Sequence, residues 1–246
     1  MDNPPSLGHK MLLRFFATQP HPCSYLEEKE ATTLFADPAF PMDAATYSQL
    51  ATRGFRRSGQ HIYRPFCDSC KACVPLRIPV TDFRYDRQQK RCWRRNQDLS
   101  IQLVEDIRSG EHYRLYANYL QQRHRDGDMY PPNREQYDSF LATPVFHQEQ
   151  PVTHYIEFRK GQQLLAVAVA DILASGLSAV YTFYEPTEED RSLGVFAVLF
   201  QVELTRRLQL PHLYLGYWIQ QSRKMSYKSR YRPHQLLLDG RWTDAE

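Results

Sequence analysis

Three β-rich runs follow one another in the second half of the chain: VTHYIEF at 152–158, QLLAVAVADIL at 163–173 and LSAVYTFY at 177–184. Gly161 lies in the first gap and Ser175-Gly176 in the second. Small, turn-forming residues between short β-type runs are typical of hairpin connections. The spacing therefore predicts an antiparallel meander of three strands.

Helical and strand-like segments flank this meander on both sides. Hydrophobic periodicity predicts a strand at Leu99–Val104 and helices at Glu111–His124 and Arg134–Leu141 before it. After it comes a helix from Ser192, a candidate N-cap, to about Leu210, and then a strand at Leu213–Ile219. The chain is thus predicted to be α+β with a mostly antiparallel sheet. Its order of elements resembles the core of the GNAT acyltransferases.

The first part of the chain gives weaker signals. Residues 1–76 are punctuated by Pro, Gly and Cys, which predicts a small irregular Cys-containing region ahead of a GNAT-like domain over 77–246. The run Val74–Val80 is β-type but contains Pro75 and Pro79. Since proline cannot donate a ladder hydrogen bond, this run is predicted to be an edge strand or the end of one.

The composition is that of a globular protein. Of 246 residues, 42% are hydrophobic and 24% charged, with a formal net charge of only +3, which argues against a disordered chain. Five cysteines are an odd number for a disulfide framework. The longest apolar run, Leu164–Ala174, is interrupted by Asp171 and is too short to cross a membrane. No secretory leader pattern precedes it, so we expect a cytoplasmic protein without membrane partners.

The positive charge is concentrated in two places. Arg53–Arg95 holds twelve Lys and Arg residues against three Asp, and Arg223–Arg232 holds five cations and no carboxylate. Within the first segment, residues Arg87–Asn96 predict a helix whose cations lack carboxylate partners four residues away. A solvated charged face is one interpretation, and an RNA-binding surface that places cations on phosphates is the other. The aromatic residues interleaved with both basic segments favour RNA.

Three cysteines form the tightest local pattern, Cys67-x-x-Cys70-x-x-Cys73, with Cys23 as a distant fourth. Four thiolates suit zinc or an iron–sulfur cluster. The usual structural zinc site has two separated Cys-x-x-Cys pairs, whereas this chain has one compact triplet. Metal ligation and small, partly buried side chains in a tight turn both remain open.

The loop entering the helix at Ser192 resembles the phosphate-binding loop of GNAT enzymes. It reads Arg191-Ser192-Leu193-Gly194-Val195-Phe196. Phe196 falls where that loop needs a small residue, and the acidic residues 188–190 beside it repel anions. The sequence therefore argues against coenzyme A as a ligand.

Several further residues are candidates for a site. Arg123-His124 ends a predicted helix, where the pair binds either a carboxylate ligand or the helix's own carbonyls. Asp171 lies in an apolar strand, where a carboxylate must be paired with a cation or used functionally. Tyr181 and Tyr217 lie on predicted strands.

Motifs along nearly the whole chain resemble the bacterial aspartate/glutamate leucyltransferases, the bacterial branch of the arginyl-tRNA–protein transferase family. The matching residues, in chain order, are Gly54–Gly59, Tyr63–Pro65, Cys67/Cys70/Cys73, Val74–Arg77, Arg94–Asn96, Arg123-His124, Leu177–Tyr184, Arg191–Gly194, Tyr214–Ile219 and Lys224–Lys228.

The resemblance implies a reaction and its partners. Leucine moves from leucyl-tRNA to the N-terminal Asp or Glu of a protein, which marks that protein for degradation by the N-degron route. Transfer requires no cofactor, and DNA is not a partner. Arginine as the transferred residue, a coenzyme-A-dependent N-acetyltransferase, and a non-catalytic RNA-binding protein with zinc are the alternatives.

On this resemblance we assign candidate roles to individual residues. The acidic side chain is expected to contact Arg56, Arg57, Arg77, Arg123 and His124. The tRNA is expected to contact Arg91, Arg94, Arg95, Lys224 and Lys228. Asp171, Tyr181 and Tyr217 are candidates near the chemistry, and Cys23, Cys67, Cys70 and Cys73 are the candidate metal ligands.

Overall fold

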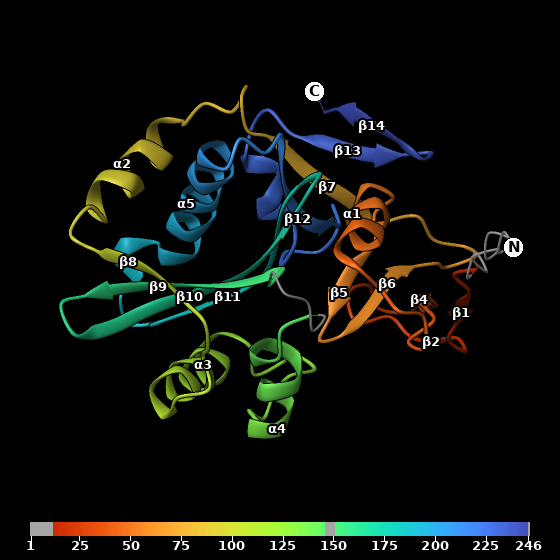
Figure 1. The fold of residues 1–246 in the computed structure, drawn as a ribbon, viewed down its shortest axis with the longest axis horizontal. Helices are drawn as coiled ribbons and strands as arrows, with labels where there is room; N and C mark the ends of the chain where they lie inside the picture. Colours follow the sequence, from red (N-terminus) through yellow and green to blue (C-terminus); the bar gives the residue numbers. More distant parts are fainter. Residues whose placement is uncertain (1–11, 146–150, 246) are drawn as a thin grey trace, which may run out of the picture.

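The predicted meander forms the middle of the protein. A computed structural model describes residues 12–145 and 151–245. In it, β9 (Thr153–Lys160), β10 (Gln163–Leu173) and β11 (Gly176–Tyr184) pair antiparallel, and β8 (Ser100–Val104) adds to β9. The meander and the strand before it are therefore confirmed (Figure 1).

These strands belong to an eight-stranded sheet with the order β14-β13-β7-β12-β11-β10-β9-β8. The other strands are β7 (Val74–Pro79), β12 (His212–Trp218), β13 (Gln235–Leu238) and β14 (Arg241–Asp244). All neighbouring strands in the sheet are antiparallel except β11 and β12, which α5 (Leu193–Arg207) connects as a crossover. The predicted α+β class with a mostly antiparallel sheet is confirmed.

Helices cover both faces of the sheet (Figure 1). On one face lie α5 and α2 (Arg87–Arg95), and on the other lie α3 (Gly110–Arg123) and α4 (Arg134–Tyr137), the latter continued by the π-turn η1 (Asp138–Ala142). The two-residue period of β10 explains this arrangement. Its alanines 166, 168 and 170 join the core with α5, whereas valines 167 and 169 join the core with α3.

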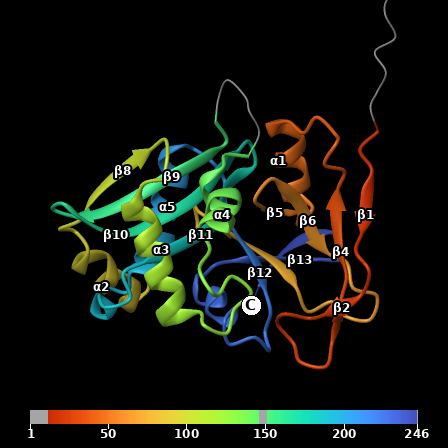
Figure 2. The same ribbon diagram turned by 90° about the horizontal axis from the view of Figure 1, so that it is seen from below.

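The N-terminal region is more regular than the sequence predicts. A second sheet has the order β1-β4-β6-β5, carries α1 (Ala44–Thr52), and lies at one side of the main sheet (Figure 2). Its strands are β1 (Phe15–Ala17), β4 (Thr33–Ala36), β5 (Arg56–Ser58) and β6 (His61–Pro65), and a small ribbon pairs β2 (His21–Pro22) with β3 (Glu30–Ala31). These strands are too short to show a period, and β1 finds its partner β4 far along the chain.

The prediction that Val74–Val80 is an edge strand is wrong. As β7 it lies inside the sheet, between β12 and β13. The two prolines are accommodated because β13 pairs only with Leu76 and Arg77, two of the three residues between Pro75 and Pro79. Among the described residues, no helix is long and apolar enough to span a membrane.

Candidate active site

The sheet opens where its two parallel strands part. β11 and β12 are paired only at Leu177/Leu213 and Ser178/Tyr214. Beyond this point residues 179–182 of β11 become half-buried, although the neighbouring strand β10 stays almost wholly buried. On β12, a register shift and a left-handed Gly216 (φ 78°) follow directly. The backbone of both strands is thus partly released from the ladder at the centre of the fold.

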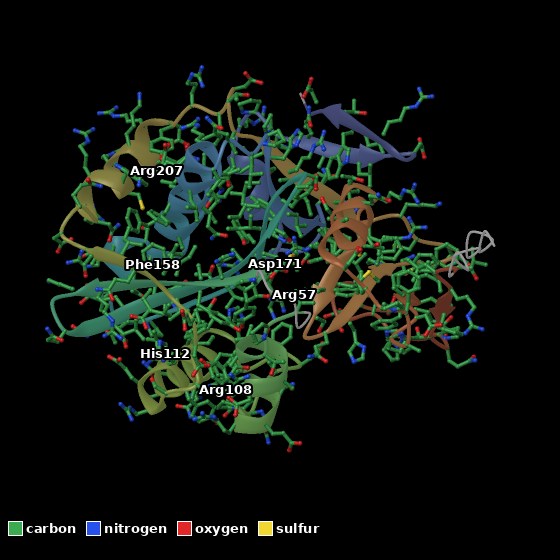
Figure 3. The ribbon with its side chains drawn as sticks, in the orientation of Figure 1. Arg57, Arg108, His112, Phe158, Asp171 and Arg207 are labelled. Carbon is green, nitrogen blue, oxygen red and sulfur yellow. The ribbon has the colours of Figure 1, made fainter. Side chains whose placement is uncertain are left out.

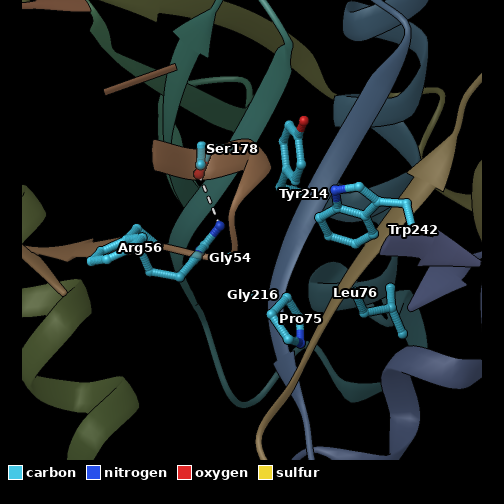
Figure 4. A pocket seen from close by; sticks show the side chains of 10 residues that line it. Gly54, Arg56, Pro75, Leu76, Ser178, Tyr214, Gly216 and Trp242 are labelled. Atoms are coloured by element: carbon cyan, nitrogen blue, oxygen red, sulfur yellow. Dashed lines mark hydrogen bonds between the residues drawn. The ribbon is translucent and has the colours of Figure 1, made fainter. Parts of the chain in front are cut away.

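Arg56 of β5 reaches this parting from the N-terminal sheet. Its Nη1 donates to Ser178 Oγ at 2.8 Å, and its Nη2 donates to the carbonyl of Ala179 (Figure 4). The left-handed Gly216 leaves room for it, because a Cβ there would lie 3.2 Å from Arg56 Nε. A cavity of about 10 Å³, room for about one water molecule, is lined by Arg56, Ser178 and Gly216 among others. Arg56 is therefore a half-buried cation whose hydrogen-bond partners are neutral oxygens.

Lys228 lies beside Arg56 and points inward. It belongs to the 3-10 turn η3 (Ser226–Arg230) and is only 7% exposed. Its Nζ donates to the Tyr217 carbonyl at 2.6 Å and lies 3.3 Å from Met225 Sδ. Burial, and then the charge of Arg56, lower the pKa of Lys228 from 10.5 to about 7. The predicted tRNA contact by Lys228 is wrong, because a side chain this deeply buried cannot reach a polyanion on the surface.

Tyrosines surround the two cations. The charge of Arg56 acts on Tyr63, Tyr217 and Tyr227, but burial is the larger effect and raises the pKa of all three phenols. Tyr217 is buried and donates its hydroxyl to the Gly54 carbonyl at 2.8 Å. The structure therefore gives its ring a packing role and leaves its backbone carbonyl, held by Lys228, at the site.

Tyr181 also lies on β11, three residues beyond Ser178. It is half-buried, burial raises its pKa, and its ring meets Phe140 edge-on with centroids 5.8 Å apart. Tyr119 of α3 and Tyr184 of β11 pack together, with their ring centroids 4.8 Å apart. Tyr181 thus remains a candidate for contact with a substrate.

Arg123 and His124 lie at the C-terminal end of α3. His124 Nε2 lies 2.9 Å from the Tyr119 hydroxyl, and burial, then Lys224, lower the His124 pKa. The exposed Lys224 forms an ion pair with Asp126 at 2.7 Å. Arg123 binds Glu189 at 2.7 Å, so its charge already has a carboxylate partner. The predicted site residues Arg123, His124 and Lys224 therefore lie close together.

Two of the predicted site residues, Arg57 and Asp171, are fully buried. Arg57 Nε and Asp171 Oδ2 are 2.6 Å apart, and neither side chain is exposed (Figure 3). Tyr47 and Thr153 also donate to the Asp171 carboxylate. The expectation that Asp171 is paired with a cation is confirmed. The catalytic role for Asp171 and the substrate contact by Arg57 are wrong in this structure, since no substrate can reach either group.

Arg77 is also already engaged. Its Nε donates to Gln235 Oε1 at 2.7 Å, and its guanidinium lies 4.3 Å from the centre of the Trp242 ring. It lies on β7, inside the sheet, and links that strand to the C-terminal hairpin. These contacts give Arg77 a structural role rather than a free charge for a substrate.

The basic helix α2 is confirmed and has an exposed cationic face. Asp86 and Gln89 form a capping box at its start. Arg91, Arg94 and Arg95 are all exposed, and Arg95 also donates to the carbonyl of Asp190. Trp93 packs on Phe196 with centroids 5.3 Å apart, so its ring is part of the α2–α5 contact.

The loop before α5 differs from a diphosphate-binding loop for a reason the sequence did not show. Phe196 is buried in the core, 1% exposed, and does not face the loop. Instead Arg191 is held by Asp98 and Glu188, each at 2.8 Å, and Asn96 of α2 donates to the Arg191 carbonyl at 2.8 Å. Residues at and after the C-terminal end of α2 therefore bind this loop.

The cysteines converge without forming a ligand set. Burial, followed by Cys23, Cys67 and Cys70, raises the pKa of Cys73 to about 12. Within residues 12–145 and 151–245, however, no three His, Cys, Asp or Glu side chains are placed to hold a metal ion. The side chains as they stand do not fit a four-thiolate site, because a tetrahedral site needs all its sulfurs within bonding distance of one point.

Sequence reasoning missed the residues that shape the parting of the strands. Ser178 and Tyr227 carry no signal beyond their type, and Lys228 looked like one more surface cation. The inward turn of Lys228 depends on two contacts of its amine, with Met225 Sδ just before η3 and with the Tyr217 carbonyl of β12.

Comparison with known proteins gives consistent matches. Family models described as "Arginine-tRNA-protein transferase, N terminus" and "C terminus" match residues 21–91 and 111–238. The aspartate/glutamate leucyltransferase of Pseudomonas fluorescens is 55% identical over 230 residues, covering 94% of this chain and 96% of that protein. That of Saccharophagus degradans is 52% identical over 231 residues, with the same coverage. Among solved structures, L-PGS from Bacillus licheniformis matches with a TM-score of 0.49 at 10% identity, over 71% of this chain and 59% of that one, too distant a likeness to support an argument.

Proposed function

The chain belongs to the arginine-tRNA–protein transferase family, and we propose that it is an aminoacyltransferase that moves leucine from leucyl-tRNA to proteins beginning with Asp or Glu. The names of relatives that share more than half of its residues over nearly its whole length support the leucyl donor and the acidic acceptors. A cytoplasmic role in tagging proteins for degradation by the N-degron route follows from that reaction.

The uncompensated positive charge at the parting of β11 and β12 is the observation that carries the acceptor assignment. Arg56 and Lys228 lie together there, and in the described part of the chain their hydrogen bonds go to hydroxyl, carbonyl and thioether groups rather than to carboxylates. A half-buried cation without an anion is costly, as Arg56 is here, and so is placing a second positive charge on Lys228 beside it. A carboxylate placed between them would relieve that cost, and Arg forms strong, directional hydrogen bonds with carboxylates.

The reaction requires few catalytic groups from the protein. The ester of an aminoacyl-tRNA is already activated, so no metal or cofactor is needed. The α-amine nitrogen of the acceptor attacks the ester carbonyl carbon, a peptide bond forms, and the ester C–O bond breaks. The ribose hydroxyl then leaves with one of the protons from the amine. Holding amine and ester together supplies much of the rate, and polar donors at the released strand ends are suited to stabilise the oxyanion.

We assign the tRNA to the surface formed by α2 and the basic segment 223–232. Arg91 and Arg94 project from α2, and Gln89 of the same helix donates to the Arg230 carbonyl at 3.4 Å. The exposed cations Arg223, Lys224, Arg230 and Arg232 continue this surface along the chain segment that contains Lys228. Clustered cations bind the phosphate backbone without reading sequence. We further propose a GNAT-like core, because β11, α5 and β12 form a crossover whose strands part at the site.

The test offers radiolabelled leucyl-tRNA and arginyl-tRNA, separately, to peptides beginning with Asp, Glu, Asn, Gln or Lys. The expected result is leucine on the Asp and Glu peptides and on none of the others. Transfer of arginine to the same peptides would mean that the donor is arginyl-tRNA, while the assignment of the acceptor site would stand. Absence of transfer from both tRNAs would overturn the function. Titration with acetyl-coenzyme A, run in parallel, is expected to show no binding because residues of α2 occupy the loop before α5.

A further inference from the structure

Lys228 differs from the other cations of its segment in the direction it faces. Arg223, Lys224, Arg230 and Arg232 are exposed, whereas Lys228 is turned into the protein beside the parting strands. Its amine donates to the Tyr217 carbonyl near the end of β12, and the charge of Arg56 from β5 acts on it. A cation that only held η3 in place would not need to be buried next to a second cation.

The hydrogen bonds of the Lys228 amine match its neutral form. Within the described residues Nζ has two acceptors, the Tyr217 carbonyl at 2.6 Å and Met225 Sδ at 3.3 Å. A neutral amine has two N–H bonds and one lone pair, whereas an ammonium has three N–H bonds to satisfy. The two acceptors satisfy both N–H bonds of the neutral amine, which keeps its lone pair.

The groups around Lys228 act in the same direction. Arg56 of β5 is the charged neighbour, and it disfavours a second positive charge. Tyr217 of β12, Tyr63 of β6 and Tyr227 of η3 surround the pair, and burial raises the pKa of each phenol, so these hydroxyls stay neutral and bring no negative charge near pH 7. An anion entering from outside is therefore what would favour the ammonium form of Lys228.

We propose that the neutral form of the Lys228 amine accepts the proton of the acceptor's α-ammonium group once the acidic side chain is seated beside Arg56. This inference rests on the proposed function and adds a catalytic residue to it. The α-ammonium loses one proton to Nζ, which becomes an ammonium paired with the substrate carboxylate. The freed amine then attacks the ester as described above. Only an acidic first residue supplies the charge that lets Lys228 hold the proton, so recognition and activation become one event.

A free α-amine has a pKa of about 7.7–8.0, close enough to that of Lys228, about 7, for the proton to pass in either direction. The carboxylate decides the direction, because a charge within a few ångströms moves a pKa by one or more units. A neutral first residue such as Asn has the same shape and hydrogen-bonding size but leaves Lys228 neutral. The mechanism thus predicts that discrimination between Asp and Asn acts on kcat as well as on KM.

The test compares the wild-type enzyme with Lys228→Arg on two acceptors. One is an ordinary peptide beginning with Asp, and the other is its aminooxy analogue, whose nucleophilic nitrogen is already neutral at pH 7. Arginine supplies the positive charge of the substrate-bound state but cannot accept a proton. Lys228→Arg is expected to lower kcat by about 100-fold or more on the ordinary peptide, and to lower it far less on the aminooxy acceptor. Equal losses on both acceptors would overturn the proposal, since they would mean that Lys228 only shapes the site.

A second measurement uses the unmodified chain. A succinyl peptide has the acidic side chain of Asp but no α-amine to give up a proton. Its binding at pH 8, followed by calorimetry in buffers of different ionisation enthalpy, is expected to take up about one proton per peptide. Binding without proton uptake would overturn the proposal even if Lys228→Arg failed to fold. Lys160→Ala, at an exposed lysine on β9, is the matched control and is expected to leave both measurements unchanged.

The two proposals fail in different ways. If wild-type enzyme transfers no amino acid from either tRNA to the Asp peptide, the proposed function fails. If wild-type enzyme transfers leucine but Lys228→Arg is equally impaired on the ordinary and aminooxy acceptors, the function stands and the role of Lys228 falls.

Discussion

Arg57 and Asp171 form a fully buried ion pair, with Nε and Oδ2 2.6 Å apart and neither side chain exposed. Arg57 comes from β5 of the N-terminal sheet and Asp171 from β10 of the main sheet. The next residue, Arg56, is the one that reaches the parted strands. The pair therefore fixes β5 against the meander and sets the position from which Arg56 enters the site.

Removing one partner of this pair is expected to destabilise the protein strongly. Asp171→Asn leaves the Arg57 charge buried without its anion, which costs about 3–5 kcal/mol in comparable sites. Urea denaturation followed by circular dichroism measures the loss. The double variant Arg57→Met/Asp171→Leu, which buries no charge, is expected to recover part of it. A single variant as stable as the wild type would contradict the assigned role.

Arg56 is expected to select the acidic acceptor. Arg56→Met removes hydrogen bonds to a charged group, each worth about 1.5–3 kcal/mol, so kcat/KM for peptides beginning with Asp should fall by about 10- to 100-fold. Affinity for leucyl-tRNA, measured by filter binding, should stay unchanged. Arg241→Met, at an exposed position on β14, is the control. Equal losses for Asp and Asn peptides would show that Arg56 does not read the acidic side chain.

The exposed face of α2 is expected to carry tRNA affinity. Arg91→Gln combined with Arg94→Gln should weaken binding of leucyl-tRNA and reduce the slope of log K against log salt by about 0.7–0.9 per lost phosphate contact. The KM for an Asp peptide should not change, because these side chains lie on α2, which packs on α5. The paired substitution Arg53→Gln/Arg241→Gln changes the net charge equally at two other exposed positions. The same fall in slope from that control would mean that net charge alone governs binding.

Much of this architecture is readable from the sequence because it is local. The apolar β-type run at 163–173 and the turn residues at 161 and 175–176 specify the meander, and Asp86 with Gln89 specifies the start of α2. The N-terminal sheet was not predicted as regular structure, since its strands are only three to five residues long and two of its three pairings, β1–β4 and β4–β6, join strands that other elements separate. The position of β7 was missed because only its neighbours show how Pro75 and Pro79 are avoided.

The candidate site was only partly predictable, again because its contacts join distant parts of the chain. Residue types showed that Asp171 needs a partner and that two basic segments lack carboxylates. They did not show which of two adjacent arginines faces inward to Asp171 and which faces the opening. Alternation along β5 decides this, since Arg56 and Arg57 point to opposite sides of the strand. The inward turn of Lys228 depends on the 3-10 turn η3 and on the Tyr217 carbonyl, which no local pattern reveals.

The buried Lys228 is expected to make stability depend on pH. Its pKa falls from 10.5 to about 7 on folding, so between these values the unfolded chain binds a proton at this residue that the folded chain does not. Stability from this group therefore rises with pH through that window, by about 1.4 kcal/mol per pH unit. Lys228→Met removes the titrating group and, with it, this slope. The loss of the hydrogen bond to the Tyr217 carbonyl is a constant offset that does not vary with pH.

Urea denaturation of the wild type and Lys228→Met at pH 7, 8 and 9 measures this difference. The stability of the wild type relative to the variant should increase by about 2–3 kcal/mol from pH 7 to pH 9, while Lys160→Met shows no such trend. A difference that stays flat with pH would mean that Lys228 keeps its proton in the folded protein. That result would leave the Arg56–Lys228 pair as a fixed double charge, with no neutral amine to receive a proton from the acceptor.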